Sequence, residues 1–85
     1  MKVYVLQFDV VYEYETVESF PQTRLFVNKD EAQKAFDDWR WKERSLAENR
    51  EWKIDSDENN YFSSYDENDG YAMTHTIGSL MEFEI

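Results

Sequence analysis

The sequence predicts a single α+β domain, in which an antiparallel sheet of about four strands carries one long helix on one face, in the order β-β-α-β-β. Two observations predict the sheet: apolar residues occupy every second position along residues 2–15 and again along residues 80–85, a period typical of strands with one buried face. A third predicts the helix, because the run from residue 29 to about residue 50 contains no glycine or proline and repeats its apolar residues at helical spacing. With 85 residues, the chain has room for one domain and one small core.

The first strand is predicted over residues 2–15. Its even-numbered side chains are all apolar: Tyr4, Leu6, Phe8, Val10, Tyr12 and Tyr14. Val3, Val5 and Val11 make the other face partly apolar as well. We therefore expect this strand to be central in the sheet, or to meet a helix or a partner on that second face.

The second strand is predicted over residues 23–27, after a polar stretch at 15–19. Pro21 lies at its start, where a missing amide donor is tolerated. The first two strands are expected to form an antiparallel hairpin.

The helix is predicted to begin at about Lys29 and to persist to about Arg50. Asn28 can cap it through its side-chain oxygen, and Glu31 can reach back to the amide of the cap. Its apolar face is formed by Ala32, Ala35, Phe36, Trp39 and Leu46, with Glu43 interrupting the stripe. Acid-before-base pairs four residues apart support the outer face: Asp30 with Lys34, and Asp38 with Lys42. A helix of this length measures about 30 Å and can cross the whole sheet.

The second half of the chain is predicted to complete the sheet. The expected elements are a polar loop at 55–60, a strand at 61–65, a turn at 66–70, and strands at 71–76 and 80–85. Gly78, between the last two strands, predicts a bulge or bend in one long final strand.

Charge is the most informative feature of the composition. The chain has 19 acidic and nine basic residues, a formal net charge of −10, and residues 51–85 hold nine of the acids against one base. Such a field repels nucleic acid and anionic lipid and favours basic proteins as partners, so we expect no direct nucleic-acid binding and no membrane association. The 15 aromatic residues, 18% of the chain, favour a folded domain over a disordered acidic one.

Enzymatic chemistry is not predicted. There is no cysteine, and the one histidine, His75, lies in a predicted strand without an evident nucleophile. Carboxylates among serine and asparagine are expected to be solvated, which leaves none of them with the raised pKa of a general acid. The chain also has no glycine-rich phosphate loop. We therefore expect no catalytic residues and no cofactor.

Residues 51–69 form the predicted partner-binding site. Seven carboxylates lie there against one cation, Lys53, and aromatic residues are interleaved with them. The candidate binding residues are Asp55, Asp57, Glu58, Asp66, Glu67 and Asp69, together with Trp52 and Tyr65. The first hypothesis is a non-enzymatic inhibitor that blocks a basic site on another protein, with carboxylates in place of phosphates.

Two other functions stay open. Asp55, Asp57, Asn59 and Asp66 occupy positions 1, 3, 5 and 12 of a loop that resembles a calcium-binding EF-hand loop. This loop has Asn60 in place of the turn glycine, an aspartate in place of the bidentate glutamate, and no helix after it. The third hypothesis is a structural domain that forms a homodimer through the exposed sheet face or an edge strand.

The order of three segments carries a resemblance: YVLQFDVVYEY, then NKDEAQKAF, then WKIDSDENNYFSSYDENDG. In this pattern the chain resembles small acidic proteins of phages and mobile elements, which include anti-CRISPR inhibitors. The resemblance implies an inhibitor that acts in the cytoplasm of a bacterial host cell and occupies the basic nucleic-acid site of a Cas effector. No motif is common to that group, so the resemblance assigns no functional residues.

Overall fold

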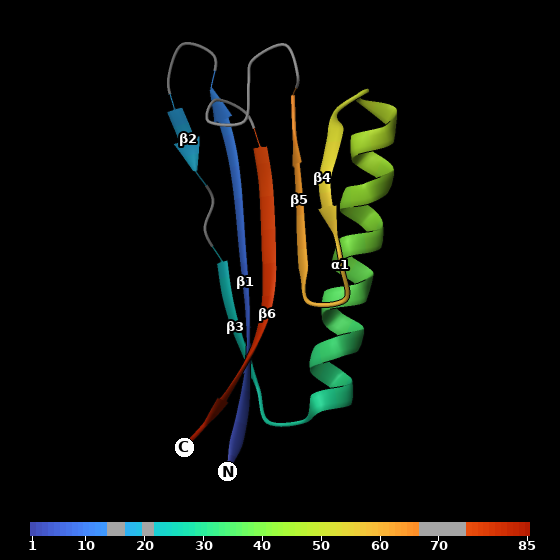
Figure 1. The fold of residues 1–85 in the computed structure, drawn as a ribbon. Coiled ribbons are helices and arrows are strands. Elements are labelled where there is room, and N and C mark those ends of the chain that lie inside the picture. Colours follow the sequence, from blue (N-terminus) through green and yellow to red (C-terminus); the bar gives the residue numbers. More distant parts are fainter. Residues whose placement is uncertain (14–16, 20–21, 67–74) are drawn as a thin grey trace.

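The computed structural model is an α+β domain with one antiparallel sheet and one helix on one of its faces (Figure 1). The structure describes residues 1–13, 17–19, 22–66 and 75–85. The strands are β1 Lys2–Glu13, β2 Val17–Ser19, β3 Gln22–Phe26, β4 Lys53–Asp57, β5 Tyr61–Tyr65 and β6 His75–Glu84, and the helix is α1 Lys29–Asn49. The predicted order β-β-α-β-β is present, with two additional short strands, β2 before the helix and β4 after it.

The sheet has the strand order β2-β1-β6-β5-β4, and β3 also pairs with β1. Because β2 pairs with residues 11–13 of β1 and β3 with residues 4–8, these two short strands form successive parts of one edge, and the sheet is five strands wide. The longest pairing joins β1 to β6, from Lys2↔Glu84 to Val11↔His75. The first strand is therefore central, as one of the two alternatives for its partly apolar second face predicted.

Two segments that were predicted to be irregular contain strands. Residues 55–60 are not a loop, because Lys53–Asp57 forms β4 and only residues 58–60 connect it to β5. The polar stretch at 15–19 includes β2. Both strands are short and mostly polar, with Ile54 as the one apolar residue of β4, so neither presents the alternation that reveals a strand. The predicted turn at 66–70 and the start of the strand at 71–76 lie outside the described residues, apart from Asp66 and the last two positions.

Gly78 does not mark a bulge. It lies within the continuous β6, in register with Phe8 of β1 and Phe62 of β5. A Cβ atom at Gly78 would lie 2.2 Å from two ring carbons of Trp39. Glycine is thus needed here because the indole of the helix packs directly on the strand backbone.

The core lies between α1 and the sheet, with Tyr4, Leu6 and Phe8 as the residues that β1 contributes. Its buried apolar side chains are Tyr4, Leu6, Phe8, Ala32, Phe36 and Phe62. Trp39 stacks on Phe8 with ring centroids 4.5 Å apart and meets Phe62 edge-on at 5.8 Å. Burying each such large side chain contributes about 1.5–3 kcal/mol, so these contacts fix α1 against the middle of the sheet.

The helix begins as its cap predicts. The backbone N–H of Glu31 donates a hydrogen bond to Oδ1 of Asn28, 3.1 Å away, which satisfies one of the free amides of the first turn. Among the described residues, no helix combines the length and the apolar composition that crossing a membrane requires.

Candidate partner-binding surface

The centre of the predicted site is a hairpin formed by β4, residues 58–60 and β5, which we call the acidic hairpin (residues 53–65). Asp55 lies where the register of β4 shifts between Ile54 and Ser56, so it is the extra residue of a bulge. Its carboxylate is exposed and accepts a hydrogen bond of 3.4 Å from the hydroxyl of buried Ser63 on β5. A charged, bulged and short edge strand also resists pairing with another chain.

Asp57 forms salt bridges within the molecule. Its carboxylate forms salt bridges with Arg40, 3.6 Å away, and Arg44, 3.4 Å away, both on α1. Arg40 also pairs with Asp37 at 3.4 Å. The side chains of Asp57 and Arg40 are each 26% exposed, so solvent screens the pair between them less than it screens pairs at the surface. Asp57 therefore holds the hairpin to the helix and does not add a free negative charge.

The turn of the hairpin is held through its backbone carbonyl groups. Gln33 of α1 donates from Nε2 to the carbonyl oxygen of Asn59 at 2.8 Å, and Arg40 donates from Nη1 to that of Glu58. The backbone N–H of Leu80 donates to the carbonyl oxygen of Asn60 at 2.9 Å. The backbone is thus anchored on two sides, while the Glu58 side chain is exposed to solvent.

The junction between α1 and β4 adds an acidic residue and an aromatic one. The N–H of Trp52 donates to the carbonyl of Ala47 at 2.8 Å and that of Glu51 to Glu48 at 3.2 Å, the two bonds of a Schellman motif. Glu51 takes the left-handed position with φ of 60°, where glycine is usual and another residue costs about 1 kcal/mol. Trp52 is half-buried, with the guanidinium of Arg50 5.1 Å from its ring centroid.

The described residues of the predicted site thus fall into three groups. Asp55 and Glu58 present exposed carboxylates on the acidic hairpin, whereas Asp57 is held by two arginines. The remaining described members, Trp52, Tyr65 and Asp66, are half-buried. Glu67 and Asp69 lie outside the described residues.

The four candidate calcium ligands do not lie in a single loop. An EF-hand loop wraps its ligands around one ion, but Asp55 and Asp57 lie in β4, Asn59 lies in the turn, and Asp66 follows β5. Within residues 1–13, 17–19, 22–66 and 75–85, no group of three or more acidic or histidine side chains is arranged to hold a metal ion.

Three residues of α1 that support the acidic hairpin were not predicted to belong to the site: Gln33, Arg40 and Arg44. With Asp37 they are spaced four, three and four residues apart, which places them on one polar stripe of the helix. The spacing of this stripe can be read from the sequence. Which residues the stripe contacts becomes clear only when residues 53–57 are known to form a strand next to the helix.

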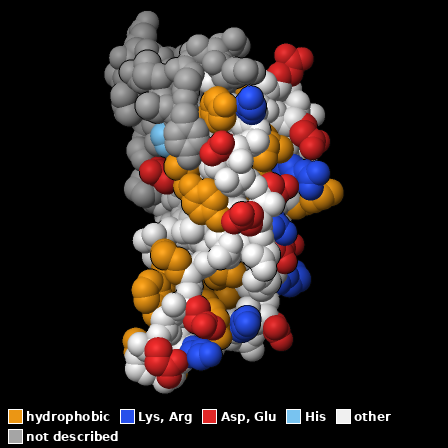
Figure 2. All heavy atoms as spheres, viewed as in Figure 1, with side chains coloured by type: hydrophobic (Ala, Val, Ile, Leu, Met, Phe, Trp, Pro, Cys, Tyr) orange, Lys and Arg blue, Asp and Glu red, His pale blue; other side chains and the backbone are white. Residues whose placement is uncertain are grey.

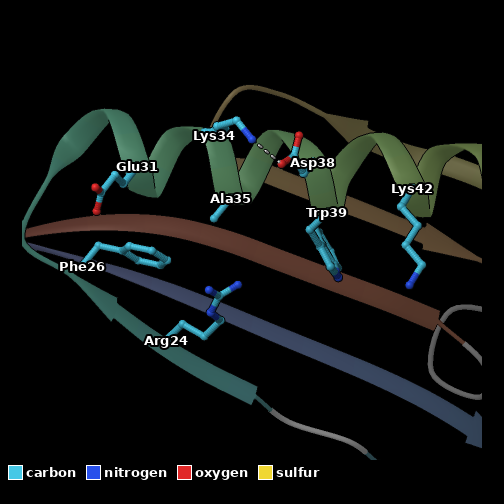
Figure 3. Close-up of a pocket in the computed structure, with 8 residues that line it drawn as sticks. All are labelled: Arg24, Phe26, Glu31, Lys34, Ala35, Asp38, Trp39 and Lys42. Carbon is cyan, nitrogen blue, oxygen red and sulfur yellow. Dashed lines mark hydrogen bonds and ion pairs between the residues drawn. The ribbon is translucent and has the colours of Figure 1, made fainter.

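A second concave region lies between α1 and β3 on the helix-bearing face (Figure 3). This groove has a volume of about 550 Å³. Phe26 and Trp39 project into it from opposite sides, and Arg24 and Lys42 point into it from β3 and α1. The Arg24 guanidinium lies 5.1 Å from the Phe26 ring centroid, and Lys34 is paired with Asp38 at 3.3 Å on the helix. The groove is open and has mixed charge.

Glu43 is a half-buried carboxylic acid on α1. Burial raises the pKa of Glu43, and the neighbouring Lys42 and Arg50 counteract part of that rise. Acidic and basic side chains lie together on the side of the molecule formed by α1, at the right in Figure 2.

No family model, curated protein or solved structure matches this chain.

Proposed function

We propose that this protein is a non-enzymatic inhibitor that binds a basic protein surface through the acidic hairpin and its flanks. The partner class is a nucleic-acid-binding enzyme, and a bacterial defence enzyme of the CRISPR-Cas type is the example that the sequence resemblance suggests. The observation that carries the proposal is the anchoring of the hairpin: α1 and β6 hold the carbonyls of all three turn residues, Glu58, Asn59 and Asn60.

Anchoring matters because binding is weakened by any order that must be created on association. The exposed carboxylates of Asp55 and Glu58 project from a backbone that is already held in place. Glu51, at the end of the helix, adds an exposed carboxylate in the preceding turn. A negative surface of this kind accelerates association with a lysine- and arginine-lined groove, and salt weakens the attraction.

The test is inhibition of purified nucleic-acid-processing enzymes, including Cas effectors, by the wild-type protein and a double variant, Asp55→Asn with Glu58→Gln. We expect the variant to lose roughly tenfold in affinity at low ionic strength, and the difference to shrink at high salt because both charges act through the solvent. The matched control is Glu82→Gln with Glu84→Gln, which removes the same charge from exposed residues of β6. Equal affinity of the two double variants, or binding that is indifferent to salt, would contradict the proposal.

A further inference from the structure

The sheet face opposite α1 carries a group of apolar side chains near the two chain ends. Tyr4, Leu6 and Phe8 of β1 face the helix, so Val3 and Val5 lie on the opposite face. The registers Val5↔Leu25, Val5↔Met81 and Val3↔Phe83 place their partners there too. Met1 and Ile85 continue this pairing through two hydrogen bonds of 2.7 and 2.8 Å. We call the following residues the uncharged sheet face: Met1, Val3, Val5, Leu25, Val27, Met81, Phe83 and Ile85.

Most of these side chains are open to solvent. Leu25, Val27, Ile85 and Met1 are about 70% exposed, at 72%, 73%, 73% and 69%, and Phe83 is 48% exposed. In Figure 2, hydrophobic side chains gather at the lower left, over the strands near the chain ends. Single exposed apolar residues are ordinary, but a contiguous group on one face is typical of an interaction surface.

The distribution of charge between the two faces is uneven. In the stretches 1–7, 23–27 and 79–85, all of which the structure describes, no odd-numbered residue has a charged side chain. The charged residues of these three stretches are even-numbered and lie on the helix side: Lys2, Arg24, Glu82 and Glu84. Asp9, the next odd-numbered acid along β1, lies beyond them, away from the chain ends. A chain with a net charge of −10 thus has a part of its sheet where another acidic molecule can approach without facing carboxylates.

We infer that the uncharged sheet face is the contact between two copies of this chain, which pack sheet against sheet. A basic partner would find no carboxylate to pair with on this face, so charge does not select such a partner here. A second copy brings the same uncharged surface, and aligned packing of two sheets about 10 Å apart lets branched side chains from both faces interdigitate.

The shape of the face supports contact with a copy of itself. Next to the apolar group, on the same side of the sheet, lies a hollow of about 260 Å³ lined by Gln7, Asp9, Thr23, Ile77 and Ser79, among others. Asp9 is the one charged residue of this lining, and a second copy would bring apolar side chains to it and not another carboxylate. A two-fold axis between the group and the hollow places the protruding side chains of each copy over the hollow of the other. Such reciprocal contact is what a symmetric dimer requires.

The area sets the strength of the dimer. At about 100 Å² for each of the five mainly exposed side chains, each copy would bury on the order of 500 Å². The total, on the order of 1,000 Å², is at the lower limit of specific interfaces. The dimer should therefore be weak and depend on concentration, and it uses no residue of the acidic hairpin.

The test is sedimentation of the full chain from about 10 µM to about 1 mM, at low and high salt. We expect a monomer–dimer equilibrium that high salt strengthens, because salt screens the repulsion between two copies of charge −10. Leu25→Glu should raise the dissociation constant at least tenfold. The matched control is Trp41→Glu, since Trp41 is also exposed, at 68%, but lies on α1.

A second measurement needs no variant: amide chemical shifts of the wild-type protein should move with concentration in β1, β3 and β6 and not along α1. The inference is overturned if the chain stays monomeric at about 1 mM, or if Trp41→Glu abolishes association while Leu25→Glu does not. Inhibition of an enzyme through the acidic hairpin is measured separately and weakens with salt, so either proposal can fail alone.

Discussion

The acidic hairpin and the uncharged sheet face are both exposed, but their surfaces are built in different ways. The hairpin carries charged side chains, and arginines of α1 neutralise part of that charge by pairing with Asp57. The sheet face carries apolar side chains in register across three strands. A net charge of −10 therefore describes neither region: the hairpin has one of its three carboxylates paired with arginines and two exposed, and the sheet face has no charged side chain. Salt should weaken binding at the first and strengthen it at the second.

The largest expected effect comes from Gly78→Ala, which acts on both regions because it disturbs the packing that positions them. The new methyl group would lie 2.2 Å from the Trp39 ring, so the helix must shift or the indole must leave the core. We expect the free energy of unfolding in urea to fall by about 3 kcal/mol.

The control for this prediction is the double variant Gly78→Ala with Trp39→Leu. It removes the ring that the methyl group meets. In this background, Gly78→Ala should lower the free energy of unfolding by at most about 1 kcal/mol relative to Trp39→Leu alone. A loss of the full 3 kcal/mol in the Trp39→Leu background would show that the close approach of the indole is not the reason for glycine here.

A substitution with a smaller expected effect, Arg40→Met, should affect the acidic hairpin and leave the uncharged sheet face unchanged. It removes the salt bridges to Asp37 and Asp57 and the hydrogen bond to the carbonyl of Glu58, while the methylene stem keeps its packing. We expect a loss of about 1–2 kcal/mol in the free energy of unfolding, with faster hydrogen exchange of amides in β4 and the turn.

Self-association of the same variant should be unchanged, because Arg40 lies on the helix side of the sheet. The comparison variant is Lys34→Met, which removes one exposed pair with Asp38 and should cost less than about 0.5 kcal/mol. If Arg40→Met leaves exchange in the hairpin as it is in the wild type, the arginine does not anchor it.

The sequence predicted the elements with strong periodicity and missed those without it. The strand that begins at Lys2 and the helix from Lys29 were predicted correctly, because alternation and a capping residue are local signals. β4 was missed because its single isoleucine and its bulge at Asp55 leave no period to read. The engagement of Asp57 by Arg40 and Arg44 followed from β4, so it could not be predicted either.

The uncharged sheet face shows a different limit. The alternation of Met81, Phe83 and Ile85 with Glu82 and Glu84 is clear in the sequence, but alternation does not say which face meets the helix. In β1 the even positions face α1, and the register Tyr4↔Glu82 then sends the apolar positions of β6 to the other side. Only the pairing of strands reveals that these apolar residues join those of β1 and β3.

The smallest expected effect tests the same contrast at a single carboxyl, Glu43. Burial raises the pKa of Glu43 above its ordinary value of 4.5, and Lys42 and Arg50 offset part of the rise. A raised pKa in the folded state means that the fold favours the protonated form. This contribution to stability is therefore complete below pH 4.5 and is lost as the pH rises through the folded-state pKa. Glu43→Gln stays neutral at every pH and should avoid the loss.

Thermal unfolding of Glu43→Gln against the wild type across acidic and neutral pH measures this effect. We expect similar stability near pH 4 and an advantage for the variant of about 0.5 kcal/mol at pH 7, because solvent screens a half-buried carboxyl. For a domain of this size, that difference raises the Tm by roughly 2–4 °C. Glu48→Gln serves as the comparison, since it removes a salt bridge with Arg44 at 3.5 Å and should lower the Tm at pH 7 or leave it unchanged. An advantage for Glu43→Gln that is as large near pH 4 as at pH 7 would mean that its source is packing and not the charge of the carboxylate.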